Sequence, residues 1–266
     1  MAQGWLGLEG RAVIVTGGAS GIGNHIVTTL AAAGAYPVIA DLTVETGAER
    51  DGAYCVHCDV TDAQSVQAMA DAVVAQYGKI DALVNVAGIN LPRLLVDVRG
   101  ERPEYELNDD SYNKMFDINV RGMVYCAQAC VRQMLKQGGG VIVGMSSESG
   151  KEGSQGQSAY SATNSARDAL IRSWAKELGP YHIRVVGIAP GIMEPTGLRS
   201  PAYNEALAYT RGVKVEDLST DYRKVIPLGR EGKLDEVGNL AAFLVSDRSS
   251  YITGTTINIS GGKSRG

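Results

Sequence analysis

Apolar residues in this chain fall into two alternating patterns. Short apolar runs bounded by Gly, Asp or Pro suit strands that are covered on both faces of a parallel sheet. Between them lie longer segments in which apolar residues recur at helical spacing, as at Val66, Met69, Ala70, Val73, Val74 and Tyr77. Strands are expected at residues 13–15, 38–40, 54–60, 82–84, 141–143, 185–186 and 257–259, and helices at 21–34, 62–77, 109–136, 158–179 and 235–246.

This alternation predicts the fold class. Repeated strand–helix units build a doubly wound, Rossmann-type parallel sheet of about seven strands flanked by helices. No repeat or linker interrupts residues 1–266, so we expect a single α/β domain. Two stretches with prolines, 89–108 and 190–225, are expected to be loops. Both follow strands, and ligands of such sheets bind outside the carboxyl ends of strands, so these loops should wall a substrate site.

A glycine-rich turn directly follows the first expected strand and opens the first helix. Glycine permits a tight turn and close backbone approach, and a helix N-terminus favours the negative charge of a dinucleotide pyrophosphate. A glycine triplet alone is weak in a chain with 33 glycines, but the flanking strand and helix make this motif more specific. We therefore expect cofactor contacts at Gly17, Ser20, Gly21, Ile22 and Gly23.

The carboxylate of Asp41 predicts which dinucleotide is bound. Asp41 ends the second expected strand, eighteen residues beyond Gly23, and Leu42 follows it. A carboxylate there accepts hydrogen bonds from the adenosine ribose hydroxyls and repels a 2′-phosphate. NAD is therefore the expected cofactor, with Asp41 and Leu42 among its contacts. The alternative interpretation of Asp41 is a simple turn residue.

A second cluster of polar residues completes a family signature. Ser147 precedes Tyr160 by thirteen residues, and Asn164 follows Tyr160 by four. With the glycine-rich turn, this pattern resembles the short-chain dehydrogenase/reductase family over almost the whole chain. The family's signature is a Tyr followed four residues later by a Lys. The resemblance implies that Tyr160 exchanges a proton with the substrate oxygen, Ser147 hydrogen-bonds that oxygen, and Asn119 holds a water in a proton relay.

The same resemblance assigns further cofactor contacts. Segments after the third, fourth and sixth strands match family elements beside the adenine, the sheet edge and the nicotinamide. The contacts assigned in this way are Asp59, Val60, Asn85, Ala87, Gly88, Tyr160, Asn164, Pro190, Gly191 and Met193, with Thr196 one position later than the usual Thr.

Asn164 departs from the family pattern. The Lys usual at this position holds the nicotinamide ribose and, as a fixed cation, favours the ionised tyrosine. A neutral Asn can hydrogen-bond a ribose hydroxyl but supplies no such field. We therefore expect turnover that is lower by about 10²- to 10⁴-fold, and a gain in kcat from Asn164→Lys. Lys151, the nearest basic residue in that loop region, is interpreted either as a compensating cation or as a solvated loop residue.

Segments that vary among family members indicate the substrate. They resemble the family's polyol-phosphate dehydrogenases, which implies NAD-linked oxidation of a phosphorylated sugar alcohol to a ketose phosphate. The segments are 92–97, 146–150, 173–179, 190–194 and 251–266. Arg93, Lys151 and Arg199 are the candidate phosphate ligands, and Glu148 is assigned to the substrate side. The alternatives are an unphosphorylated sugar, a secondary alcohol or a ketoacyl substrate, or an NAD-binding protein without catalysis.

Composition limits the partners and the location. The net charge is −4 and the pI about 5.5, without a basic cluster, so no nucleic-acid partner is expected. No apolar run approaches the roughly 18 residues of a membrane span, and residues 1–10 lack the pattern of a signal peptide. A cytoplasmic location is expected. Family members commonly form tetramers through the long helices at 109–136 and 158–179, so the resemblance implies a homotetramer.

The four cysteines are interpreted as core thiols. Cys55 and Cys58 have metal-like spacing, but alternation along a strand would put them on opposite faces. Cys126 and Cys130 lie four apart on an expected helix. Neither a metal site nor a disulfide is expected.

Overall fold

A computed structural model describes residues 4–197, 199–218 and 221–264. These residues form one eight-stranded sheet in the order β3-β4-β2-β1-β5-β6-β7-β8. Its strands are β1 (Ala12–Thr16), β2 (Tyr36–Asp41), β3 (Glu49–Arg50), β4 (Ala53–His57), β5 (Ala82–Asn85), β6 (Gly140–Met145), β7 (Ile183–Pro190) and β8 (Thr256–Ile259). Every pair is parallel except β3 with β4. The predicted doubly wound sheet is confirmed, and the short β3 at one edge was not predicted.

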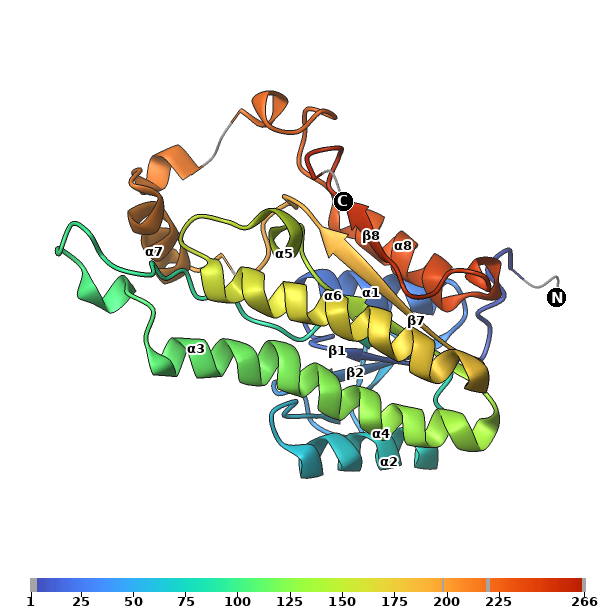
Figure 1. The fold of residues 1–266 in the computed structure, drawn as a ribbon. Coiled ribbons are helices and arrows are strands. Elements are labelled where there is room, and N and C mark those ends of the chain that lie inside the picture. Colours follow the sequence, from blue (N-terminus) through green and yellow to red (C-terminus); the bar gives the residue numbers. More distant parts are fainter. Residues whose placement is uncertain (1–3, 198, 219–220, 265–266) are drawn as a thin grey trace.

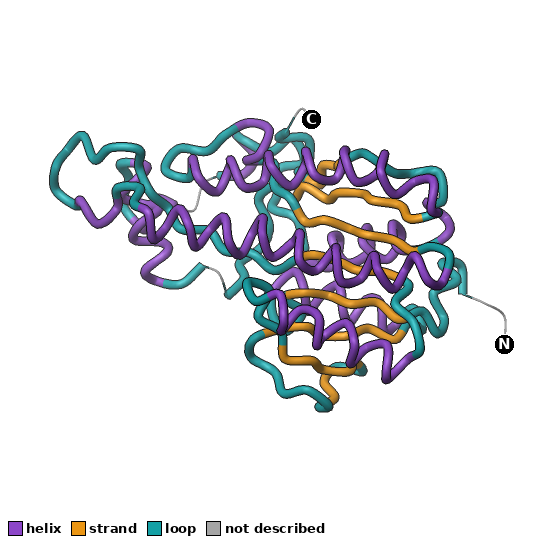
Figure 2. Tube along the Cα trace, turned by 60° about the horizontal axis from the view of Figure 1, so that its bottom comes forward, coloured by secondary structure: helices purple, strands orange, loops and turns teal. Residues whose placement is uncertain are grey.

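Helices cover both faces of this sheet (Figures 1 and 2). The α-helices are α1 (Gly21–Ala32), α2 (Ala63–Tyr77), α3 (Asp109–Phe116), α4 (Gly122–Gln137), α5 (Ser149–Glu152), α6 (Ser158–Leu178), α7 (Pro201–Arg211) and α8 (Leu234–Val245). Short 3-10 helices span Pro103–Tyr105, Gly179–Tyr181, Val215–Leu218, Tyr222–Lys224 and Asp247–Ser249. α1 packs with α8, and α2 with α4. No helix in the described ranges is long and apolar enough to cross a membrane.

Alternation along the strands sends neighbouring side chains into two separate apolar clusters. In β1, Val13 and Val15 join the cluster that contains α1 and α8, whereas Ile14 joins the one that contains α2 and α4. Cys55 and Cys58 also lie in different clusters, as the predicted alternation requires. Because both faces of the sheet are covered, its strands need apolar residues at every position, which explains the continuous apolar runs.

The predicted helix 109–136 is present but interrupted. A π-helical turn, Asp117–Arg121, separates α3 from α4. Asn119 lies in this turn, and its amide accepts a hydrogen bond from Ile89 N (2.8 Å) and donates one to Ile89 O (2.9 Å). The turn therefore fixes the chain just beyond β5, at the carboxyl end of the sheet, a position typical of π-turns near functional sites.

The expectation of a loop over 190–225 is wrong in part, because this stretch contains α7. Ser200 caps the helix, with Oγ accepting from Tyr203 N (3.1 Å), and Pro201 occupies the first turn, where its missing N–H costs nothing. Gly212 ends it in a left-handed conformation. The other stretch with prolines, 89–108, lies beside α7 in Figure 1. Tyr209 Oη in α7 donates to Asp97 Oδ1 in this stretch (2.8 Å). The two stretches thus pack on each other.

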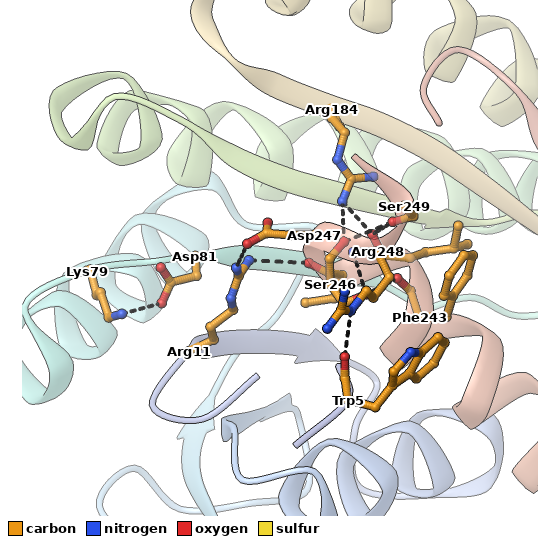
Figure 3. Close-up of polar contacts among 12 residues, drawn as sticks. Trp5, Arg11, Lys79, Asp81, Arg184, Phe243, Ser246, Asp247, Arg248 and Ser249 are labelled. Carbon is orange, nitrogen blue, oxygen red and sulfur yellow. Dashed lines mark hydrogen bonds and ion pairs between the residues drawn. The ribbon is translucent and has the colours of Figure 1, made fainter. Parts of the chain in front are cut away.

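Three arginines form hydrogen bonds and an ion pair near the amino ends of the strands, as Figure 3 shows. Arg184 Nη2 donates to Leu244 O (2.8 Å) and Ser246 O (3.1 Å), which satisfies carbonyls at the C-terminus of α8. Arg11 pairs with Asp247, and Arg248 Nε donates to Trp5 O (2.6 Å). These contacts hold the N-terminal segment at the amino ends of the strands, opposite the carboxyl ends where ligands of such sheets bind.

Candidate active site

A cavity of about 550 Å³, called the inner cavity below, runs along the carboxyl ends of the strands. Open parallel sheets bind ligands there, since the loops that follow successive strands converge at this edge. The predicted cofactor contacts that line this inner cavity are Gly17, Ser20, Gly21, Ile22, Gly23, Asp41, Leu42, Asp59, Val60, Ala87, Gly88, Tyr160, Pro190, Gly191 and Met193. Thr196 lines it as well. Residues far apart in the sequence therefore meet in one elongated space.

The glycine-rich turn has the geometry of a phosphate cradle. Gly17 (φ +66°) and Gly21 (φ +51°) are left-handed, which favours glycine. A Cβ on Gly23 would lie 2.1 Å from Gly17 O, so no side chain fits between the turn and α1. Ser20, at the N-cap of α1, makes no side-chain capping bond. The first amides of α1 are thus left for an anion, and the turn fits a dinucleotide pyrophosphate.

Two carboxylates that line the inner cavity, those of Asp41 and Asp59, are held in fixed positions. Asp41 Oδ2 accepts from Ala19 N (3.2 Å), and its Oδ1 accepts from Thr43 N (3.0 Å). Asp59 Oδ1 accepts from Thr61 N (2.9 Å). Both side chains are held by backbone amides, so Asp41 is positioned beside the glycine-rich turn without any bound ligand.

Asn85 lies outside the cavity lining. It is 4% exposed, and its amide meets Thr16 Oγ1 (3.4 Å) and Met123 O (3.5 Å). Thr16 Oγ1 in turn accepts from Val86 N (3.1 Å) and Ala87 N (3.2 Å). The structure therefore places Asn85 beneath the segment that lines the cavity, where it supports the join between β1 and β5.

Ser147 and Tyr160 stand where two cavities meet. An outer cavity of about 440 Å³ lies against the inner one, and both residues line both spaces, as do Gly191, Met193 and Tyr203. Ser147 Oγ accepts from Ser149 N (3.3 Å), which orients the hydroxyl at the start of α5. A molecule in the outer cavity can therefore meet a ligand of the inner cavity beside Ser147 and Tyr160.

Asn119 and Asn164 are both 0% exposed and line neither cavity. Asn119 Nδ2 donates to Thr163 Oγ1 (3.1 Å) in addition to Ile89. Asn164 Nδ2 donates to Tyr160 O (2.9 Å), one turn back along α6. Asn164 Oδ1 is buried without a hydrogen-bond partner in the described part of the chain. The structure thus does not bring Asn164 to the cofactor cavity.

Arg167 lines the inner cavity and was missed by sequence reasoning. Its guanidinium donates to three backbone carbonyls: Nε to Asn119 O (2.6 Å), Nη1 to Met145 O (2.8 Å) and Nη2 to Ala87 O (2.7 Å). Burial lowers the pKa of Arg167 to about 10. The side chain is still a cation at neutral pH, held between the ends of β5 and β6.

The predicted substrate residues separate into two groups. Glu148 lines the outer cavity and Arg199 lines both cavities, whereas Arg93 and Lys151 line neither. Arg93 Nη1 instead donates to Pro92 O (2.8 Å), and Lys151 is exposed on α5. The structure adds two cations to the outer cavity, Arg211 from the end of α7 and Lys263 from beyond β8.

The outer cavity also holds carboxylates. Lys263 Nζ lies 2.6 Å from Glu148 Oε1 and 3.5 Å from Glu152 Oε2. Tyr203 Oη accepts from Gln157 Nε2 (3.0 Å), and burial raises the pKa of Tyr203. The cavity therefore offers both cations and fixed hydrogen-bonding groups to a polar, charged molecule.

Of the four cysteines, Cys58 lines the inner cavity and the other three line neither cavity. Cys55, Cys58, Cys126 and Cys130 are free and buried, and burial raises the pKa of Cys58 to about 12. Within the described ranges, no three His, Cys, Asp or Glu side chains gather as metal ligands.

A dinucleotide cradle that opens onto a Ser–Tyr pair defines a class of nicotinamide-dependent oxidoreductases. Residues 17–264 match a family model described as enoyl-(acyl carrier protein) reductase. The chain belongs to the short-chain dehydrogenase/reductase family, and it is an oxidoreductase that uses a nicotinamide cofactor.

Named relatives and solved structures resemble the chain over nearly its full length. A sorbitol-6-phosphate 2-dehydrogenase of Klebsiella pneumoniae is 51% identical over 98% of this chain and 99% of its own length. A 3-oxoacyl-(acyl-carrier-protein) reductase of Thermotoga maritima is 35% identical over 96% and 98%. The ligand-free aldohexose dehydrogenase of Thermoplasma acidophilum superimposes with a TM-score of 0.82 at 27% identity, covering 98% and 96%. The NADH complex of a Brucella melitensis 3-ketoacyl-(acyl-carrier-protein) reductase gives 0.79 at 28%, covering 97% and 99%.

Proposed function

We propose that this enzyme oxidises a phosphorylated sugar alcohol with NAD, converting sorbitol 6-phosphate to fructose 6-phosphate. The observation that carries the proposal is the meeting of two cavities at Ser147 and Tyr160, with cations in the outer one. The 51% identity with a sorbitol-6-phosphate 2-dehydrogenase supports the choice of substrate. The expected reaction needs a dinucleotide in the inner cavity and a polyol phosphate in the outer one.

The residues divide the chemistry between them. When bound, the nicotinamide cofactor accepts a hydride from the carbinol carbon. Ser147 Oγ hydrogen-bonds the carbinol oxygen and holds it in place, while Tyr160 Oη removes the proton from that oxygen. The amides at the start of α1 hold the pyrophosphate, and Asp41 accepts hydrogen bonds from the adenosine ribose. Tyr203 and Gln157, which are hydrogen-bonded to each other, line the outer cavity together with Tyr160.

Asp41 supports NAD rather than NADP. Its carboxylate is held by Ala19 N and Thr43 N, so it cannot turn away from a 2′-phosphate without losing those bonds. We expect Asp41→Ala to reduce the preference for NAD over NADP by about tenfold or more, the worth of a hydrogen bond to a charged group. Steady-state kinetics with both cofactors measure this ratio. An unchanged ratio contradicts the assignment of Asp41.

The phosphate of the substrate is expected to bind the cations of the outer cavity. Replacing Arg199 and Arg211 together with Gln should raise KM for sorbitol 6-phosphate by about tenfold or more, since each charge-assisted hydrogen bond is worth roughly 1.5–3 kcal/mol. The KM for unphosphorylated sorbitol should change little. Lys151→Gln is the matched control, because Lys151 is exposed and lines neither cavity.

NADH formation with a panel of substrates tests the proposal against its alternatives. Faster turnover of unphosphorylated sorbitol, a secondary alcohol or a ketoacyl thioester would move the enzyme to that substrate class, which the reductase and aldohexose dehydrogenase relatives make reasonable controls. Tight NADH binding without turnover of any substrate would favour a nucleotide-binding protein instead.

We also propose that the chain forms a homotetramer through α4 and α6. The sequence suggested that Ala127, Ala129, Ala159, Ala162 and Ala166 permit close helix approach, but Ala127, Ala129 and Ala159 are buried within the chain. The small residues exposed on α6 are Ala162, Ser165 and Ala169, and these would permit close approach of a second copy. Light scattering that shows only the 28.1 kDa monomer would rule this out. The cytoplasmic location stays a prediction of the sequence.

A further inference from the structure

Arg167 carries a buried charge that forms no ion pair in the described part of the chain, and the effect of burial outweighs the attraction of the neighbouring Asp168 carboxylate. The residue is 4% exposed, and the acceptors of its three hydrogen bonds are all backbone carbonyls. Asp168, the next residue, accepts from Thr256 Oγ1 (2.9 Å) instead. Within the described ranges, no carboxylate forms an ion pair or hydrogen bond with Arg167. Burying a charge is costly unless it is compensated, so the presence of a charged side chain at this buried position calls for an explanation.

The position of Arg167 relates it to Tyr160. Tyr160, Asn164 and Arg167 lie at i, i+4 and i+7 along α6, on one face of the helix. Long helical side chains lean toward the helix N-terminus, so the guanidinium extends back toward Tyr160. A Cβ on Gly88 would lie 3.1 Å from Arg167 Nη2 and 3.4 Å from Nη1. The guanidinium therefore packs against Gly88, which also lines the inner cavity.

Electrostatics couples the same two side chains. Burial is the main influence on Arg167 and lowers its pKa, while interaction with Tyr160 acts in the opposite direction. The guanidinium donates hydrogen bonds to three fixed backbone carbonyls, which prevent it from moving away.

Asn164 is complementary to this arrangement. It is neutral, fully buried, and bonded back to Tyr160 O. A lysine at this position would place a second cation one helical turn from Arg167 on the same buried face, where like charges repel. A neutral residue at position 164 therefore avoids charge repulsion with Arg167.

We propose that Arg167 supplies, one turn further along α6, the fixed positive charge that the family's lysine supplies at position 164. This inference rests on the proposed role of Tyr160. In the oxidation, the proton passes from the carbinol oxygen to ionised Tyr160 Oη and the hydride passes to the nicotinamide; Arg167 exchanges nothing. Arg167 is a positioning residue that acts through Tyr160, and it replaces the expectation that Asn164 leaves the enzyme weakened.

A titration that needs no substrate tests the proposal. The titration is carried out on the NAD-bound holoenzyme with Tyr203→Phe present throughout, because Tyr203 interacts with Tyr160 and would otherwise titrate with it. The near-ultraviolet absorbance of tyrosinate, taken as the difference from the same protein with Tyr160→Phe, then reports the ionisation of Tyr160. Arg167→Met should move this transition to higher pH by about one unit or more, whereas Arg167→Lys should leave it within a few tenths of a unit. An equal transition in the wild type and in Arg167→Met overturns the inference. Because no turnover is required, this result does not depend on the proposed substrate.

Kinetics of a double-mutant cycle provide the second test. Arg167→Met should lower kcat at neutral pH by about 100-fold, with the basic shift repeated in its pH profile. Asn164→Lys alone should lower the melting temperature without raising kcat. The double variant Asn164→Lys/Arg167→Leu should recover most of the wild-type kcat that Arg167→Met loses. It also provides the test if Arg167→Met fails to fold. A gain in kcat from Asn164→Lys alone, or no recovery in the double variant, contradicts the proposal.

Discussion

Tyr160→Phe is expected to lower kcat by about 10³- to 10⁴-fold while NADH binds as in the wild type. The change removes one oxygen from a side chain that lines both cavities, and it leaves the ring that packs there. Ser147 Oγ remains to hold the carbinol oxygen, but a serine hydroxyl is a poor base near neutral pH. The proton then has no acceptor at the junction of the cavities, so the loss falls on kcat more than on KM.

Kinetics and fluorescence titration with NADH measure the two effects separately. Tyr181→Phe is the matched control, because Tyr181 is 56% exposed and follows the far end of α6. The control should keep the activity of the wild type. Retention of more than about a tenth of kcat in Tyr160→Phe would mean that another group moves the proton.

Gly23→Ala is expected to abolish detectable NADH binding and to destabilise the fold. The added Cβ would lie 2.1 Å from Gly17 O, 2.8 Å from Gly17 C and 3.0 Å from Gly18 Cα. These are backbone atoms, so no side-chain rotation relieves the overlap, and either the turn or the start of α1 must move. Overpacking of this kind costs roughly 1–3 kcal/mol, and movement of the turn misplaces the amides that hold the pyrophosphate.

Thermal unfolding and NADH titration measure the two consequences. Gly179→Ala is the matched control, since a Cβ there meets nothing within 4 Å and the backbone is not left-handed. It should melt and bind as the wild type does. Normal NADH affinity in Gly23→Ala would show that the turn tolerates a side chain and is not a close-fitting phosphate cradle.

Local patterns in the sequence account for the parts of the fold that were predicted. Continuous apolar runs indicated the strands because both faces of the sheet are covered, and glycines between a strand and a helix indicated the cradle. α7 was missed because the prolines of 190–225, Pro201 among them, were interpreted as signs of a loop. The signal was present: Ser200 before Pro201, and Gly212 after the last helical residue, are the usual start and end of a helix.

Resemblance alone was a weaker guide to individual side chains. Asn119 and Asn164 were assigned to the proton relay and the ribose, and the structure places both outside the cavity lining. Lys151 was considered as a compensating cation, yet it is exposed on α5, away from both cavities. The spacing of seven residues between Tyr160 and Arg167 on the same expected helix could have indicated that Arg167 lies on the cavity side of that helix.

The sequence by itself determined the parallel α/β sheet, the glycine-rich cradle and the Ser147–Tyr160 pair, because each is encoded in residues close together along the chain. Only the tertiary structure decided which charges reach the site. Arg167 depends on carbonyls of Ala87, Asn119 and Met145, and the outer cavity joins Arg211 to Lys263 across separate elements. Burial and electrostatic fields arise from all elements that surround a group, so no local pattern specifies them.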